Sequence, residues 1–475
     1  MKKLLLIVFI FMSFVCNSQI GFSYKISKPY YIFNFLETAN SCHSCSSTYT
    51  NYINSSLINN AEFNKIKSDF NKINTNYSFT INNLPSNRKN NRYIHDLIVS
   101  NLINSETITE FRNKSFGILP NYDLQSLVSN LEKAEEFYNK YVWEKSEAKT
   151  LEIINQATTY KDIINKISPK IAHFYNTSMF SDIPYTIAFY PIPVQKGNST
   201  ATPHTNSLSI GFLAEKQEDL PGVLGVAIHE MSHVLYNEQS ADFQNELTKY
   251  FKENKSEYSD LANNFFDEAL ATAIGNGWAY KKMHGKLDGN DWYDNTYING
   301  FAHEIYPMVE EYLEQGKQLD KTFIDKSIAL FAKKFPESIY SFDVLMNNVI
   351  IYSDEEGNEK ANEILNLVKS KFKMSHYGMS SPILHEYSLE DLRNSTSTQF
   401  IIINKNEKEN MTKLSEIFIQ LKGLKLQENA AYTFKDTNRV VILIKYDKST
   451  DLETLINKIK EQKYYNPKSI IQTKI

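Results

Sequence analysis

The stretch VAIHEMSHVL, residues 226–235, decides how the rest of the chain is interpreted. It holds two histidines four residues apart, His229 and His233, and Glu230 directly follows the first of them. On a helix, residues four apart lie one above the other on the same face, so both imidazoles can bind one metal ion. A carboxylate beside that ion can accept a proton from a metal-bound water. The spacing therefore predicts a hydrolytic metal centre.

The flanking residues favour a buried helix around this motif. Pro221 and Gly222 mark its start, and the residues from 223 to 235 are apolar nearly all round. Two histidines and a glutamate in a buried helix cost free energy unless a partner satisfies them, and a zinc ion with its water would do so. The alternative is a pair of core histidines bonded to backbone carbonyls.

A catalytic zinc ion normally has three protein ligands, so a third must come from elsewhere. The metzincin extension would need Gly at 236 and His at 239, where this chain has Tyr236 and Gln239. The segment 264–274 has helical periodicity and places Glu268 on the same face as Thr272. An unpaired carboxylate facing the interior is costly, and a metal ion removes that cost.

With Glu268 as third ligand, the chain resembles the gluzincin metallopeptidases, the thermolysin-like and peptidase-MA-like zincins. The resemblance covers roughly residues 180–315, and Glu268 follows His233 by 35 residues. It implies one zinc ion per chain, held by His229, His233 and Glu268, with Glu230 as general base. It also implies a zincin-like fold and hydrolysis of peptide bonds in a peptide or protein substrate.

The chain departs from that family at one position. Thermolysin-like enzymes often have an aspartate one turn after the ligand glutamate, where it orients a ligand histidine, and this chain has Thr272 there. We expect Asp267 or a backbone carbonyl to orient the histidine instead. A solvated charge in the first turns of the helix is the alternative for Asp267.

Gluzincins generally supply a Tyr or His that donates a hydrogen bond to the oxyanion, which contributes roughly 3 kcal/mol. Tyr297, His303 and Tyr306 are the candidates, and no spacing rule selects among them. We choose Tyr306, because a helix predicted over 299–313, interrupted at Pro307, borders the expected cleft. A packed core tyrosine is the alternative.

Two strands are predicted before the motif, at 184–190 and 206–213. In zincins an edge strand runs along the active-site cleft just before the motif helix and pairs with the substrate backbone. Residues 206–213 stand where that strand should be. His204 precedes it and is expected in a surface loop.

The N-terminus has the pattern of an export signal. Lys2 and Lys3 form a positive region, Leu4–Val15 an apolar run of 12 residues, and Ser18 ends a short polar segment. The apolar run is too short to span a membrane. We predict a signal peptide over residues 1–18 and an exported protein, periplasmic, cell-surface or secreted. Lipid anchoring through Cys16 is the less favoured alternative.

The net charge, the apolar runs and the cysteines limit the kinds of partner and compartment expected for this chain. Removal of the signal peptide takes the formal net charge from −4 to −6, which leaves no basic patch for nucleic acid. No second long apolar run follows, so no transmembrane segment is expected after signal removal. Cys42 and Cys45 would be the only cysteines left, and an oxidising compartment favours a disulfide between them. A metal site with His43, or a redox role, is the alternative.

The predicted fold class is α+β, predominantly helical. Residues 30–36 look strand-like or form a buried aromatic anchor, residues 320–390 continue as helices, and 400–403 and 440–444 are strands. The expected parts are a signal peptide (1–18), a mainly helical N-terminal region (19–175), a zincin-like catalytic domain with a small edge-stranded sheet (176–390), and a small α/β C-terminal domain (391–475).

The sequence therefore favours an exported zinc-dependent peptidase. Two alternatives belong to other classes. One is a zincin-fold protein that has lost catalysis and binds a ligand or partner, against which the intact Glu230 argues. The other is a helical surface protein in which the motif is accidental.

Overall fold

The computed structural model describes residues 21–475, apart from 43–44, 86–87, 178–179, 181–182 and 438. The predicted signal peptide, with Cys16, lies outside the described residues. The described chain is 57% helical with small sheets, which confirms an α+β, predominantly helical fold class. It divides into two compact units, one formed by the chain up to Thr248 with Glu268–Asp320, the other by Lys249–Asp267 with Lys321–Ile475.

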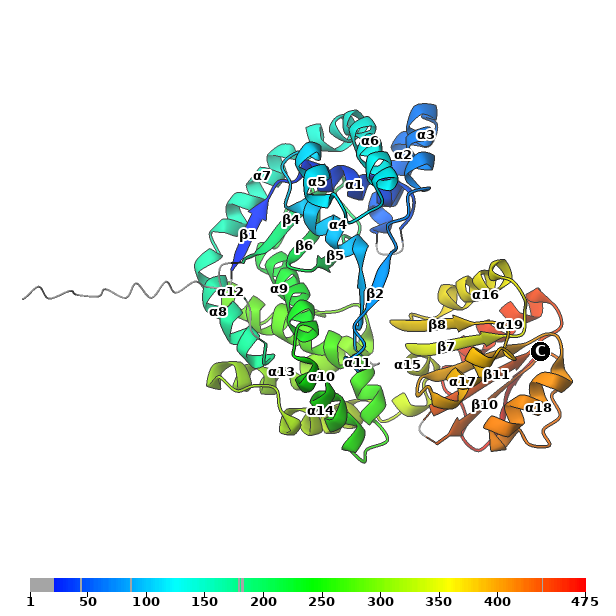
Figure 1. Ribbon diagram of the computed structural model, residues 1–475. Coiled ribbons are helices and arrows are strands. Elements are labelled where there is room, and N and C mark those ends of the chain that lie inside the picture. Colours follow the sequence, from blue (N-terminus) through cyan, green and yellow to red (C-terminus); the bar gives the residue numbers. More distant parts are fainter. Residues whose placement is uncertain (1–20, 43–44, 86–87, 178–179, 181–182, 438) are drawn as a thin grey trace, which may run out of the picture. The chain divides into compact units, whose positions relative to one another are not determined.

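The first unit contains a four-stranded sheet with the order β1-β4-β6-β5 (Figure 1). Strands β1, β4 and β6 are parallel, and β5 runs antiparallel along β6. All residues of β4 and β6 are buried, as expected for strands that are covered on both faces of the sheet. The bounds are β1 Phe22–Lys25, β4 Tyr185–Ile192, β5 Ala201–His204 and β6 Ser207–Leu213.

The two predicted strands are therefore present, but the predicted edge strand is not at the edge. Strand β6 lies between β4 and β5, and the edge is β5. The reason is a tight turn that the sequence pattern did not indicate. Thr205, at φ 57°, lies between β5 and β6 and reverses the chain, so that the residues before the predicted strand pair with it.

Helices make up the rest of the first unit. The N-terminal region is mainly helical as expected, but it is not separate, because β1 pairs with β4 across the predicted boundary at 175. Helices α10 Ala241–Glu253 and α11 Ser259–Thr272 run through both units. The other helices are α1 Lys28–Ala39, α2 Ser47–Leu57, α3 Ala61–Phe70, α4 Ile94–Ile103, α5 Ile108–Ser115, α6 Asn121–Tyr138, α7 Glu144–Thr158, α8 Lys161–Phe174, α9 Leu220–Asn237, α12 Tyr280–His284 and α13 Thr296–Gln315, with the π-helices η1 Asn139–Trp143 and η2 Ala273–Ala279 and the hairpin β2 Ser78–Thr80, β3 Asn91–Tyr93.

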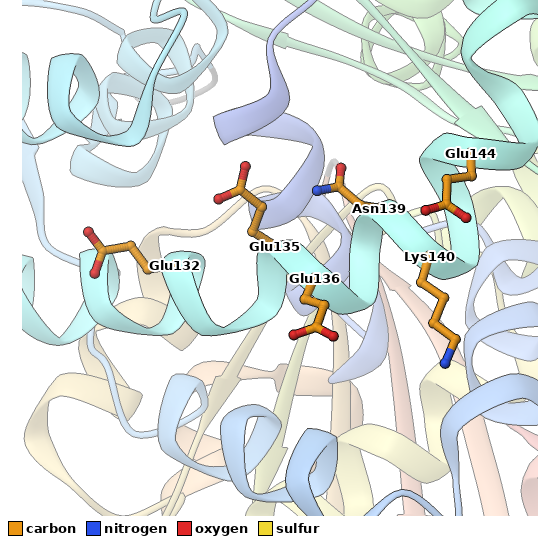
Figure 2. Close-up of a pocket in the computed structure, with 6 residues that line it drawn as sticks. All are labelled: Glu132, Glu135, Glu136, Asn139, Lys140 and Glu144. Atoms are coloured by element: carbon orange, nitrogen blue, oxygen red, sulfur yellow. The ribbon is translucent and has the colours of Figure 1, made fainter.

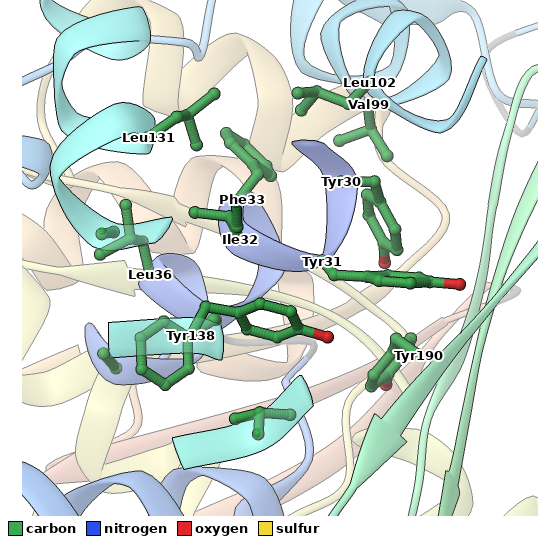
Figure 3. Packing of buried hydrophobic residues seen from close by; sticks show 14 of the residues in the cluster. Tyr30, Tyr31, Ile32, Phe33, Leu36, Val99, Leu102, Leu131, Tyr138 and Tyr190 are labelled. Atoms are coloured by element: carbon green, nitrogen blue, oxygen red, sulfur yellow. The ribbon is translucent and has the colours of Figure 1, made fainter. Parts of the chain in front are cut away.

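Helix α1 corrects the strand-like interpretation of residues 30–36 and bears out the buried aromatic anchor. Ser27 is its N-cap, with a hydroxyl that accepts a hydrogen bond from the Tyr30 backbone N–H, and Pro29 lies in the first turn. Its aromatic side chains meet the surrounding helices on one side and Tyr190 of β4 on the other (Figure 3). A helix surrounded on all sides shows no amphipathic period, so its sequence resembles a buried strand.

The second unit is a six-stranded sheet with helices on both faces. Its order is β12-β10-β11-β9-β7-β8; β8, β7, β9 and β11 are parallel, and β10 is antiparallel to both neighbours. Alternate strand residues pack against α16 and α19 on one face and α17 and α18 on the other. The elements are α14 Lys321–Lys334, η3 Ser338–Tyr340, α15 Phe342–Leu345, β7 Asn348–Ser353, α16 Asn358–Lys371, β8 His376–Ser380, α17 Glu386–Asn394, β9 Thr398–Ile403, α18 Glu407–Ile417, η4 Ile419–Leu421, β10 Ala430–Asp436, β11 Arg439–Lys445, α19 Ser449–Gln462 and β12 Ile471–Lys474.

This unit has the α/β character expected for residues 391–475, but it begins at Lys321. The expectation that 320–390 is all helical is wrong for 348–353 and 376–380. These segments form β7 and β8, and β7 pairs with β9 of the predicted C-terminal domain. The predicted boundary at 390 would therefore cut through a continuous sheet.

The structure also bears on the expected disulfide and on the expected membrane spans. Cys42 and Cys45 are joined by a disulfide, and His43 between them lies outside the described residues. Over the part of the chain that the structure describes, no helix combines the length and the apolar character needed to cross a bilayer.

Candidate metal centre

Helix α9 carries the motif as expected. It begins after the N-cap residue Asp219, has Pro221 in its first turn, and extends through the motif without interruption. His229 is only 6% exposed, whereas Glu230 and His233 are partly exposed. The two rings meet edge to face with centroids 4.7 Å apart, which follows from the four-residue spacing.

Glu268, on α11, meets both histidines. Its Oε2 lies 3.5 Å from His229 Nε2, and its Oε1 lies 3.5 Å from His233 Nε2. The two Nε2 atoms are themselves 3.0 Å apart. Thr272, at the end of α11, follows His229 by 43 residues and His233 by 39. The fold nevertheless gathers the two histidines and Glu268 at one point, as the sequence predicted.

These separations fit one tetrahedral ion. With ligand distances of about 2.0–2.2 Å for zinc, neighbouring ligand atoms lie about 3.3–3.5 Å apart. The three observed distances of 3.0, 3.5 and 3.5 Å fall close to that value. Two nitrogens and one carboxylate also form the donor set of catalytic zinc sites. The residues present therefore fit a zinc ion.

The charges around Glu268 also favour a bound metal ion. Burial raises the pKa of its carboxyl, but His233 and His229 outweigh that effect and hold the pKa well below its usual range. The carboxyl is thus held as an anion, the form that binds metal. Its Oε2 is buried and lies 3.5 Å from His229 Nε2, too far for a strong hydrogen bond. A buried anionic oxygen that is bound so weakly is costly unless a cation neutralises it.

Glycines bring the two ligand helices together. A Cβ at Gly275 would lie 2.5 Å from the Gly225 carbonyl oxygen and 2.6 Å from the backbone nitrogen of His229. The helix that carries Glu268 continues through Gly275 and Gly277 as η2. The missing side chain of Gly275 lets η2 pack directly on α9, while that of Gly277 makes room for the rings of Trp292 and Tyr306.

Thr272 lies against the far nitrogen of His229. Its hydroxyl oxygen is 3.5 Å from His229 Nδ1, and the residue is fully buried. The threonine at the position where thermolysin-like enzymes often have an aspartate therefore lies next to the ring of His229. A hydroxyl at this distance makes a long, weak hydrogen bond, in contrast to the strong one of a carboxylate.

Tyr293 is the site residue that the sequence interpretation missed. It lies in the loop between α12 and α13, and its ring stacks on His229 with centroids 6.0 Å apart and an interplanar angle of 21°. Burial, then Glu268 and to a lesser degree Glu230, raise the pKa of the Tyr293 hydroxyl, so it stays a hydrogen-bond donor. No residue pattern in the sequence marks this position.

All three tyrosine and histidine candidates belong to α13. Tyr306 is buried on α13, where its ring packs edge to face on Trp292 and burial and Glu310 raise the pKa of its hydroxyl. His303 is exposed and stacks on Trp292 at 3.8 Å. Tyr297 lies in the first turn of α13 and is partly exposed.

His204 and an acidic surface hollow are two further features of the first unit. His204, expected in a surface loop, is the last residue of β5 and is 6% exposed. An open hollow beside α6, η1 and α7 is lined by four glutamates with Asn139 and Lys140 (Figure 2). These carboxylates are spread along the helices rather than directed at one point, as on an ordinary solvated helix face.

Comparisons with protein-family models, with curated proteins and with solved structures found no match to this chain.

Proposed function

We propose that this protein is an exported zinc-dependent peptidase of the gluzincin type. The observation that carries the proposal is the meeting of His229 and His233 on α9 with Glu268 on α11, with ligand atoms 3.0–3.5 Å apart. These three residues would hold the ion. When bound, zinc lowers the pKa of a coordinated water towards neutrality and polarises the substrate carbonyl.

Glu230 is the general base in this proposal. It follows His229 in the chain, is partly exposed, and is close enough to Tyr293 to raise the pKa of that hydroxyl. A carboxylate there accepts the proton of the attacking water and passes it to the nitrogen of the leaving amine. Glutamine at this position would keep the size of the side chain but could not accept the proton.

Tyr293 takes the role that the sequence assigned to Tyr306. Its hydroxyl is protonated and neighbours Glu268, whereas Tyr306 packs against Trp292 and Glu310. A hydroxyl beside the scissile carbonyl stabilises the charge that develops on its oxygen. The stack on His229 holds the ring in position for that contact.

The edge strand β5 is the proposed docking place for substrate backbone, in place of residues 206–213. It is the last strand of the sheet on that side and packs against α9. An extended peptide can add to a sheet edge through main-chain hydrogen bonds. A peptide or protein substrate fits such an edge.

Metal content of the purified mature protein tests the proposal. Elemental analysis should find zinc in the wild type and in Glu230→Gln, and a loss of about one zinc per chain in His233→Ala and in Glu268→Ala. Cleavage of a mixture of internally quenched peptides should be lost in all three variants. A zinc content that is unchanged in both ligand variants, or full activity in Glu230→Gln, would contradict it.

A further inference from the structure

A second group of metal-ligand side chains lies in the first unit. His95 and Asp96 are in the first turns of α4, and His204 ends the edge strand β5. One ligand atom from each residue lies within 4.8 Å of the others. The rings of His95 and His204 are 5.9 Å apart between centroids.

His204 and Asp96 lie at a distance close to that between two ligands of one ion. His204 Nδ1 and Asp96 Oδ1 are 2.9 Å apart, close to the about 3.3 Å between two ligand atoms on a tetrahedral zinc. His204 is 6% exposed, while the side chains of Asp96 and His95 are 22% and 26% exposed. The group is therefore held by the protein interior but open enough for an ion to enter.

Glu37 supplies a second, independent indication. Its Oε1 lies 2.8 Å from His95 Nε2, and its side chain comes from α1. A histidine that binds metal through one nitrogen usually holds a carboxylate with the other, which fixes the ring and raises its basicity. Glu37 thus leaves His95 Nδ1 as the ligand atom.

We propose that His95, Asp96 and His204, with Glu37 orienting His95, form a second site for zinc or a similar divalent transition metal. Two imidazoles and one carboxylate select such ions over calcium or magnesium, which prefer oxygen ligands. The ion would join α4 to β5 and so fix the edge strand that packs against α9. The same contacts without an ion would form only a hydrogen-bonded link between α1, α4 and β5.

Lys89 offers a way to distinguish a metal site from a link made only of hydrogen bonds. Its ammonium lies 4.0 Å from Asp96 Oδ2, and its side chain is 47% exposed. A cation so close to a ligand carboxylate competes with a bound metal ion. Removing it should tighten metal binding several-fold, whereas a link made only of hydrogen bonds would gain nothing in metal affinity.

The experiment uses the full mature chain, dialysed against zinc chloride and analysed for bound metal. The His229→Ala/His233→Ala double variant removes the first site and should retain one zinc, against two in the wild type. Adding Asp96→Asn to the double variant should abolish that zinc, and adding Lys89→Met should tighten it. Asp96→Asn keeps the shape of the side chain and so tests the site without opening the core around His204.

His376→Ala is the matched control, because His376 is exposed on β8 in the other unit and should change nothing. A double variant without zinc, beside a wild type with one, would overturn the second site and leave the proposed peptidase intact. One zinc in both proteins, lost on Asp96→Asn, would support the second site and contradict the proposed peptidase. Unfolding curves would show that each variant is folded.

Discussion

A Cβ atom at position 275 would lie 2.6 Å from the backbone nitrogen of His229, so Gly275 sets how closely η2 approaches the motif helix. Backbone atoms cannot move aside as a flexible side chain can. The position of one metal ligand therefore depends on the absence of a side chain at another residue. The first prediction follows from that contact.

Gly275→Ala should lower the free energy of unfolding by about 1–3 kcal/mol, the usual cost of overpacking. The better helix propensity of alanine offsets at most about 1 kcal/mol of this. Zinc affinity should fall as well, because the added methyl group displaces His229. Gly289→Ala is the control, since a Cβ there meets nothing within 4 Å. Thermal unfolding that is unchanged in Gly275→Ala would contradict the packing described.

Thr272→Val should weaken zinc binding by up to about tenfold without unfolding the protein. Valine keeps the shape of the buried side chain but removes the oxygen that lies 3.5 Å from His229 Nδ1. Competition with a chelator of known affinity measures the change. Thr158→Val, on the exposed face of α7, is the comparison. Equal affinities in the two variants would show that Thr272 does not orient the ring.

Tyr293→Phe should reduce kcat on a quenched peptide by about 10²-fold and leave KM and zinc content nearly unchanged. Phenylalanine preserves the stack on His229 and removes only the hydroxyl. Tyr306→Phe is the direct comparison, because that residue packs against Trp292 instead. A large loss of kcat in Tyr306→Phe and none in Tyr293→Phe would reverse the assignment.

Glu314 should stabilise the first unit in a pH-dependent way. Lys282, Lys170 and the Trp278 indole all contact its carboxylate, and together they lower its pKa to about 2, against burial. A lowered pKa stabilises the folded state above the unfolded value of 4.5, and this contribution is lost as pH falls from there to about 2.

Glu314→Gln should therefore lower the free energy of unfolding at pH 7 by about 0.5–1 kcal/mol, the range for ion pairs exposed to solvent. The difference in the free energy of unfolding between this variant and the wild type, measured by urea titration, should shrink as the pH falls from 4.5 to 3. Glu363→Gln, on an exposed face of α16, should show little effect at any pH. A difference that stays constant across this range would rule out the ion pairs as its cause.

Several elements were predicted because their signals are local. The segments 185–192 and 207–213 are rich in apolar residues over a strand-like length, and they appear as β4 and β6. Helix α1 and strands β7 and β8 were not predicted as such. Helix α1 is buried on all sides, so its period is hidden, and β7 forms a strand by pairing with β9 almost fifty residues later.

The sequence by itself determined that His229 and His233 share one helix face, because a four-residue spacing brings side chains together whatever surrounds the helix. It also pointed to Glu268, since a carboxylate in an apolar helix needs a partner. Only the tertiary structure decided that Thr272 and Tyr293 flank His229 and that Tyr306 does not. Their placement depends on how η2 packs on α9 and how a loop returns across it, and such long-range packing leaves no spacing rule in the chain.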